Sequence, residues 1–155
     1  MKYIMNNFIK KIGHVAVFVR GSRKAKKIEL PKKNLLKIST VFPFDLLPDT
    51  ITLDREKLTV VNRTFFGSAK IISTPYKDIL SVELEVGPFL GNVIIKTRFF
   101  ENEPLTVSLL TKADAYKLKN LLAGYIIATQ NNEDFSQLSD KQLVEKLSSL
   151  GKVIK

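Results

Sequence analysis

The sequence predicts a mainly β domain of the α+β class, a bent antiparallel sheet or barrel that one C-terminal helix closes. Short strand-like runs follow one another between residues 50 and 109, and turn residues separate them. Apolar residues then recur at helical spacing from about Lys112 to Ala128. Short connections require antiparallel neighbours, and a strongly bent sheet needs its open end covered. Strands and helix are therefore expected to form one unit.

The strand pattern is clearest in Leu80–Val86, where every second residue is apolar and the residues between are serine or glutamate. This period of two is typical of a half-buried strand. A turn at Gly87–Gly91 would set Glu83 opposite Lys96, which predicts a solvated, salt-bridged face rather than paired catalytic carboxylates. The other expected strands are Leu36–Phe42, Thr50–Leu53, Leu58–Phe66, Ala69–Ser73, Val93–Phe100 and Leu105–Leu109.

Two helices have recognisable starts. Thr111 is a good N-cap for the closing helix, and Asp114 follows three residues later. After the polar residues 131–134, Ser139 and Gln142 match a capping box that precedes a second apolar stripe. This second helix is too short to fold alone. It is expected either to pack back on the barrel or to contact a partner or another copy.

Three segments resemble the bacterial pleckstrin-homology-like (PH-like) family. Pro48–Val61 is similar to its opening hairpin, Ile72–Val82 to its proline-led turn into a strand, and Gly87–Arg98 to its glycine loop and following strand. The resemblance covers about half the chain. It implies a non-enzymatic binding module with a strand meander and a closing helix, often near a bacterial membrane. The first hairpin loop, Asp54–Lys57, has balanced charge and departs from the basic loop of phosphoinositide-binding members.

Charge is distributed unevenly along the chain. The net charge is +10. Residues 1–40 hold 11 cations and one anion, whereas residues 41–155 hold 14 of each. Such asymmetry indicates an anionic surface as partner, either membrane or nucleic acid. The predicted organisation is a basic amphipathic leader and tether (residues 1–33), a PH-like domain (34–130), and a linker with a short helix (131–155).

The first part of the leader has the profile of an amphipathic helix in a membrane interface. The same apolar stripe is also that of a segment packed on the barrel's own surface. His14–Arg20 is rich in β-branched residues and is an alternative strand, so residues 3–19 are open between helix and strand. The residues expected to enter a membrane are Met5, Phe8, Ile9 and Ile12.

The basic residues of the leader are expected to contact the anionic surface. Each Lys or Arg near an anionic leaflet contributes about 1 kcal/mol to binding. Nucleic acid is the alternative, through phosphate contacts. However, no aromatic residue lies between Arg20 and Lys33 to stack on bases. The predicted contact residues are Lys10, Lys11, Arg20, Arg23, Lys24, Lys26, Lys27, Lys32 and Lys33.

The sequence offers little for catalysis. It has no cysteine and one histidine, His14, and it lacks a phosphate-binding loop, a nucleophile elbow and metal-ligand spacing. No enzyme activity, cofactor or metal site is therefore expected. No apolar run approaches the roughly 18 residues of a membrane span, and no secretory signal is recognised. A cytoplasmic protein, peripheral on the inner membrane face, is expected.

These observations predict a non-catalytic adaptor. Its leader would bind anionic lipid, and its barrel would bind a protein or peptide that the sequence does not identify. The first alternative is a nucleic-acid or ribonucleoprotein-associated protein that uses the basic segment on phosphates. The second is a subunit of a larger assembly. The sequence does not predict the oligomeric state.

Overall fold

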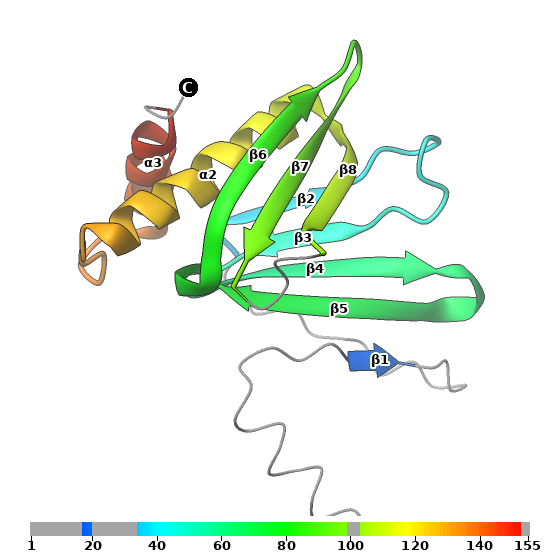
Figure 1. Cartoon of the computed structure of the whole chain (residues 1–155), viewed down its shortest axis with the longest axis horizontal. Helices are drawn as coiled ribbons and strands as arrows, with labels where there is room; N and C mark the ends of the chain where they lie inside the picture. The colour runs from blue at the N-terminus through cyan, green and yellow to red at the C-terminus, as the bar shows by residue number, and fades with distance from the viewer. Residues whose placement is uncertain (1–16, 20–33, 99–102, 153–155) are drawn as a thin grey trace, which may run out of the picture.

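The computed structural model describes residues 17–19, 34–98 and 103–152, which form two antiparallel sheets and two helices (Figure 1). One sheet has the strand order β1-β5-β4-β3-β2, and the other has the order β6-β7-β8. Two 3-10 turns, η1 (Phe65–Gly67) and η2 (Tyr76–Asp78), follow β4 and β5. The strands are β1 (Val17–Val19), β2 (Leu36–Ser39), β3 (Thr50–Leu53), β4 (Lys57–Thr64), β5 (Ser68–Pro75), β6 (Ile79–Val86), β7 (Leu90–Thr97) and β8 (Leu105–Thr111).

The helix that closes the sheets is α2 (Lys112–Gln130), and it packs on β6, β7, β8 and η2. The Thr111 hydroxyl oxygen accepts a hydrogen bond from the backbone N–H of Asp114 at 3.1 Å, which confirms the predicted N-cap. Mixed α+β structure with antiparallel strands and a capping helix is thus confirmed.

The core lies between the two sheets and α2. Both sheets and the helix contribute side chains that are fully removed from water, and burial of each stabilises the fold by roughly 1.5–3 kcal/mol. These side chains are Ile51, Leu53, Leu58 and Val60 from the first sheet, Val93, Ile95 and Leu110 from the second, and Leu118 and Leu122 from α2.

The short helix α3 (Asp140–Gly151) packs back on the domain through α2. Its predicted capping box is present, because Ser139 and Gln142 each bond the other's backbone N–H. Leu143 and Leu147 are buried and belong to the same core cluster. Of the two expected alternatives for this helix, packing on its own domain is the one that is seen.

The predicted register of the β6–β7 hairpin is wrong. Val86 pairs with Gly91, and Gly87 N–H donates to the Leu90 carbonyl at 2.8 Å, so the turn closes before Gly91. Ser81 therefore faces Lys96. Glu83 and Lys96 still form an ion pair, but diagonally across β6 and β7, with 2.5 Å between Lys96 Nζ and Glu83 Oε1.

Several predicted strand ends also differ. β2 ends at Ser39, β4 ends at Thr64 and β7 covers Leu90–Thr97, so Phe42 and Phe65 lie outside strands. Leu80, expected on the buried face of its strand, is exposed because a bulge separates Ile79 from Ser81. Val17–Val19 form β1 on the edge of β5, which supports the strand alternative for those three residues.

We expect Gly124→Ala to destabilise the protein. An alanine normally stabilises a helix interior by about 1 kcal/mol relative to glycine. Here a Cβ at Gly124 would lie 2.1 Å from the Leu147 carbonyl oxygen, so α3 must move. The free energy of unfolding in urea should fall by about 1–3 kcal/mol.

Gly87→Ala is the matched control, because its Cβ would meet only the Leu90 carbonyl oxygen, at 3.4 Å. An unchanged or raised free energy of unfolding for Gly124→Ala would contradict the close packing of α2 and α3.

Candidate functional site

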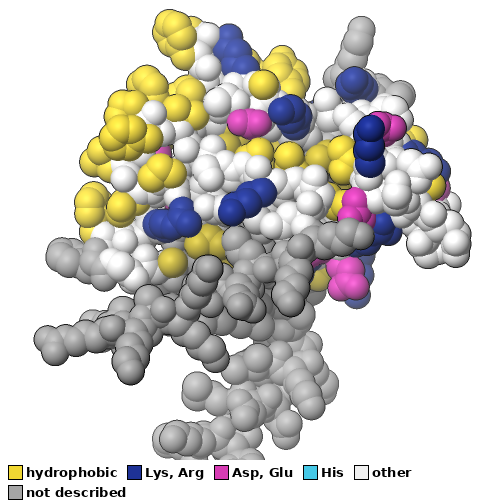
Figure 2. Space-filling model, turned by 180° about the vertical axis from the view of Figure 1, so that it is seen from behind, with side chains coloured by type: hydrophobic (Ala, Val, Ile, Leu, Met, Phe, Trp, Pro, Cys, Tyr) yellow, Lys and Arg dark blue, Asp and Glu magenta, His cyan; other side chains and the backbone are white. Residues whose placement is uncertain are grey.

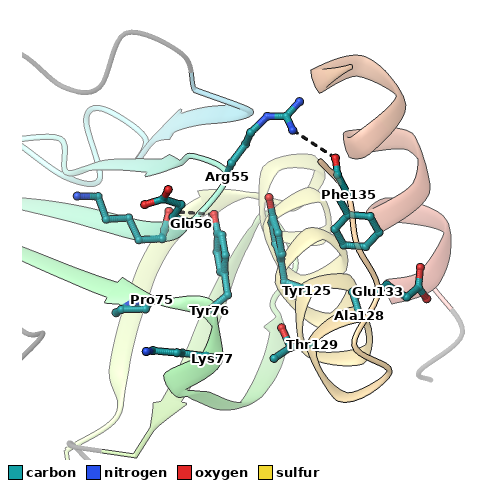
Figure 3. Close-up of a pocket in the computed structure, with 11 residues that line it drawn as sticks. Arg55, Glu56, Pro75, Tyr76, Lys77, Tyr125, Ala128, Thr129, Glu133 and Phe135 are labelled. Atoms are coloured by element: carbon teal, nitrogen blue, oxygen red, sulfur yellow. Dashed lines mark hydrogen bonds between the residues drawn. The ribbon is translucent and has the colours of Figure 1, made fainter. Parts of the chain in front are cut away.

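A cavity of about 510 Å³ opens where the β3–β4 turn, η2 and the end of α2 meet (Figure 3). Its walls come from three separate parts of the chain, and the α2–α3 connection completes the rim. The lining residues are Arg55, Glu56, Lys57, Pro75, Tyr76, Lys77, Tyr125, Ala128, Thr129, Glu133 and Phe135.

Two stacked tyrosines form the centre of this cavity. The rings of Tyr76 and Tyr125 lie 3.7 Å apart between centroids and are nearly parallel, at 9°. The Tyr76 hydroxyl lies 2.6 Å from the Asp54 carbonyl oxygen and 2.9 Å from that of Lys57, and it donates its single proton to one at a time. Tyr125 also donates to the Asp54 carbonyl oxygen, at 3.3 Å. The pair thus joins η2 and α2 to the β3–β4 turn.

The two hydroxyls stay protonated at neutral pH. Burial raises the pKa of Tyr76 far above its usual range, and the neighbouring Tyr125 and Asp54 add to the effect. Burial likewise raises the pKa of Tyr125. These groups are therefore suited to holding the β3–β4 turn in place, and not to accepting a proton.

Two lysines give the cavity its available positive charge. Among the described residues, neither Lys57 nor Lys77 has an acidic partner. Glu133 at the rim is already paired with Lys146, with 2.6 Å between the charged atoms. A ligand with an apolar group next to a carboxylate would fit such a cavity, with the apolar group on the aromatic wall and the carboxylate near the lysine ammonium groups.

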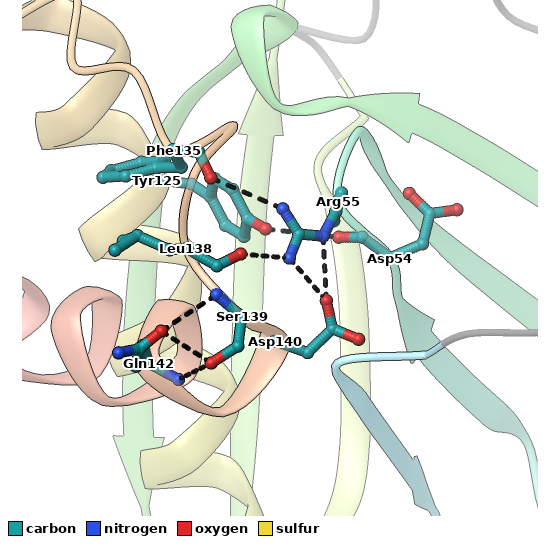
Figure 4. Close-up of polar contacts among 8 residues, drawn as sticks. All are labelled: Asp54, Arg55, Tyr125, Phe135, Leu138, Ser139, Asp140 and Gln142. Atoms are coloured by element: carbon teal, nitrogen blue, oxygen red, sulfur yellow. Dashed lines mark hydrogen bonds and ion pairs between the residues drawn. The ribbon is translucent and has the colours of Figure 1, made fainter.

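Arg55 connects the β3–β4 turn to the start of α3 (Figure 4). Its Nη2 lies 2.6 Å from Asp140 Oδ1, and the same nitrogen donates to the Leu138 carbonyl oxygen at 2.6 Å. Its Nε also donates to Asp140, at 2.8 Å. Because 85 residues separate Arg55 from Asp140, the sequence carries no local signal for this contact.

The end of the two sheets that lies opposite this cavity carries exposed apolar side chains, and we call it the loop end. It consists of the β2–β3 loop (residues 40–49), η1 and the β6–β7 turn (residues 87–89). In Figure 2 hydrophobic side chains gather along the side of the molecule that holds these tips. The exposed residues there are Phe42, Phe44, Leu46, Phe65 and Phe89.

All of the sequence-predicted site residues lie outside the described part of the chain. This holds for the expected membrane-inserting residues Met5, Phe8, Ile9 and Ile12 and for the nine basic residues from Lys10 to Lys33. The structure therefore leaves those predictions as they stand. Sequence reasoning missed the tyrosine pair and the loop end, because apolar residues are by default expected in the core.

Within residues 17–19, 34–98 and 103–152, no group of three or more His, Cys, Asp or Glu side chains is placed to hold a metal ion. No helix within the same ranges has the length and apolar character needed to cross a membrane. No protein-family model, curated protein or solved structure matches this chain.

We expect Arg55→Ala to loosen α3 without unfolding the barrel. The arginine is about one-third exposed, so solvent weakens its pairing with Asp140, and the loss of unfolding free energy should be about 1 kcal/mol. Hydrogen exchange of the α3 amides should accelerate while that of β7 stays unchanged. Lys141→Ala, an exposed α3 residue, is the control. Equal exchange in α3 for both variants would contradict a holding role for Arg55.

Proposed function

We propose that this chain is a non-catalytic, PH-like binding module that lies on the inner face of a bacterial membrane. Its basic leader binds anionic lipid, and the cavity beside Tyr76 and Tyr125 takes a segment of a protein partner. The observation that carries the proposal is the charge distribution. The whole net charge of +10 lies in residues 1–40, ahead of a body with balanced charge.

The fold supports the PH-like part of the proposal. The meander β2–β5 forms four strands of one sheet, β6–β8 form three strands of the other, and α2 follows them directly. This is the strand and helix order of the PH-like resemblance. Fold alone does not assign a function, so the binding role rests on the charge and the cavity.

The cavity supports a peptide ligand with an acidic residue. Within the described residues, its lysines Lys57 and Lys77 have no acidic partner, and its wall includes the largely buried pair Tyr76 and Tyr125. A carboxylate next to an apolar side chain would match both features. Lys57 sits opposite Pro75 in the β4–β5 pairing, so it lies directly beside Tyr76.

We expect neutralisation of the leader to weaken binding to anionic vesicles. In the full chain, replacement of Lys24, Lys26 and Lys27 by glutamine should reduce partitioning at low salt by about tenfold or more, because each lysine contributes about 1 kcal/mol. Co-sedimentation with neutral and anionic vesicles across a salt series measures this effect. Binding should fall as salt screens the charges.

The matched control removes the same charge from the body, through Lys117, Lys141 and Lys152→Gln. Equal loss in both triple variants would show that net charge alone matters and would contradict a specific role for the leader. Salt-sensitive binding to nucleic acid, with none to vesicles, would favour the alternative phosphate-binding function.

A further inference from the structure

We propose that the loop end is a second membrane-contact surface, whose phenylalanines enter the boundary between headgroups and acyl chains of a lipid bilayer. The inference rests on the proposed location at a membrane, but not on the leader. Phe42, Phe44, Leu46, Phe65 and Phe89 are 65–84% exposed. Large apolar groups concentrated at one end of a domain are typical of an interaction surface, whereas scattered ones need no explanation.

The chain brings the three tips to one end through named contacts. Val41 N–H donates to the Leu109 carbonyl oxygen at 2.9 Å, which joins the β2–β3 loop to β8. Two residues later in β8, Thr111 pairs with Leu90 beside the β6–β7 turn. Arg63, just before η1, donates its backbone N–H to Asp49 Oδ1 at 2.8 Å. The tips thus share one rim although Phe42 and Phe89 are far apart in sequence.

Polar groups hold the backbone of the β2–β3 loop and leave its apolar side chains outside. The Thr40 hydroxyl donates to Asp45 Oδ2 at 2.5 Å and accepts from the Asp49 N–H at 2.8 Å. The hydrogen bond from Thr40 lowers the pKa of Asp45, and the Leu47 N–H adds to this effect. The carboxylate is therefore ionised and engaged at neutral pH. Ordering the loop in advance reduces the entropy cost of binding.

The shape of this surface favours a bilayer over a peptide or a second protein. The exposed side chains stand on three separate tips, and the cavity beside Tyr76 and Tyr125 is at the other end of the two sheets (Figures 1 and 3). Protein interfaces need matched packing across a continuous patch. A fluid lipid interface takes side chains at several depths and requires no matched shape.

Charged side chains of both signs lie around the loop end. Lys112 follows Thr111 beside the β6–β7 turn, and Lys70 lies opposite Asn62 near η1. Within the described ranges, neither lysine has an acidic partner. The carboxylates of Asp45 and Asp49 lie nearby and accept hydrogen bonds from Thr40 and from Asn62 of β4. Lysines beside apolar tips can contact anionic headgroups when those tips enter a bilayer.

Binding through the loop end would also fix the orientation of the protein. The β3–β4 turn lies at the other end of β4 from η1, and β4 has eight residues. At roughly 3.3 Å per residue, that strand spans about 26 Å. With the tips in the lipid, the cavity beside Tyr76 and Tyr125 would face the aqueous side, where a protein partner can reach it.

A single tryptophan can report on insertion, because the chain contains none. In the full chain, Phe89→Trp places it on the β6–β7 turn, and Leu80→Trp places it at the start of β6, away from the loop end. We expect vesicles to shift the emission of the first variant to the blue and brominated acyl chains to quench it. The second should change little. Equal responses, or none from Phe89→Trp, would overturn the proposal.

Co-sedimentation supplies an independent measurement. Two variants test this, Phe89→Ser and the double variant Phe42→Ser with Phe44→Ser. Each should reduce vesicle partitioning by about tenfold or more, because each loses the favourable free energy of moving large apolar side chains from water into the bilayer. The loss should persist at high salt, unlike that of the leader variant. Leu80→Ser is the matched control, and thermal melts verify folding.

The outcomes separate this inference from the proposed function. If only the leader variant loses binding, the loop end is not a membrane surface and the leader's role stands. If only the loop-end variants lose binding, the leader's role fails and the loop end stands. No binding of the unchanged protein to either vesicle type removes both. A lipid-free dimer that Phe89→Ser turns into a monomer would instead assign the loop end to self-association and overturn the proposal.

Discussion

The burial of α2 on two sides is the constraint on which the rest of the structure depends. Leu118 and Leu122 face the sheets, while Gly124 lets the backbone of Leu147 approach too closely for any side chain. α3 is held against a helix that is itself held against β6 and β7. This stacking sets Tyr125 against Tyr76 and brings the start of α3 within reach of Arg55. The cavity therefore depends on the contact between Gly124 and Leu147, although neither residue lines it.

The two ends of the domain differ in chemistry because different connections build them. At the cavity end the connections are short, and their polar groups form hydrogen bonds with one another. The Asp54 carbonyl oxygen, for example, lies within hydrogen-bond distance of both tyrosine hydroxyls. At the loop end, residues 40–49 form a longer connection whose polar groups turn inward to Thr40 and Asp49. The apolar side chains of that connection are left in water, which costs free energy unless another surface covers them.

The sequence predicts most of this fold but not its registers. The capping residues are a local signal, and they predict the helix starts at Thr111 and Ser139 correctly. Gly91 shows the limit, because the sequence predicts a turn residue there, whereas Gly91 pairs with Val86 inside β7. A Cβ on Gly91 would lie 2.8 Å from the Cβ of Ala115, so the glycine serves a close approach to α2. Close approaches of this kind follow from tertiary packing, and turn propensity alone cannot distinguish them from turns.

The exposed residues of the loop end are not predicted from the sequence for a related reason, since a phenylalanine beside a strand is normally assigned to the core. The strand β1 ends close to η1, which carries one of these exposed residues. Val19 pairs with Ala69, two residues from Gly67 of η1, and β1 runs antiparallel to β5, so its C-terminal end points toward the loop end. Residue 20, where the most basic part of the sequence begins, follows directly. A membrane contact is stronger when charge attraction and apolar insertion apply together.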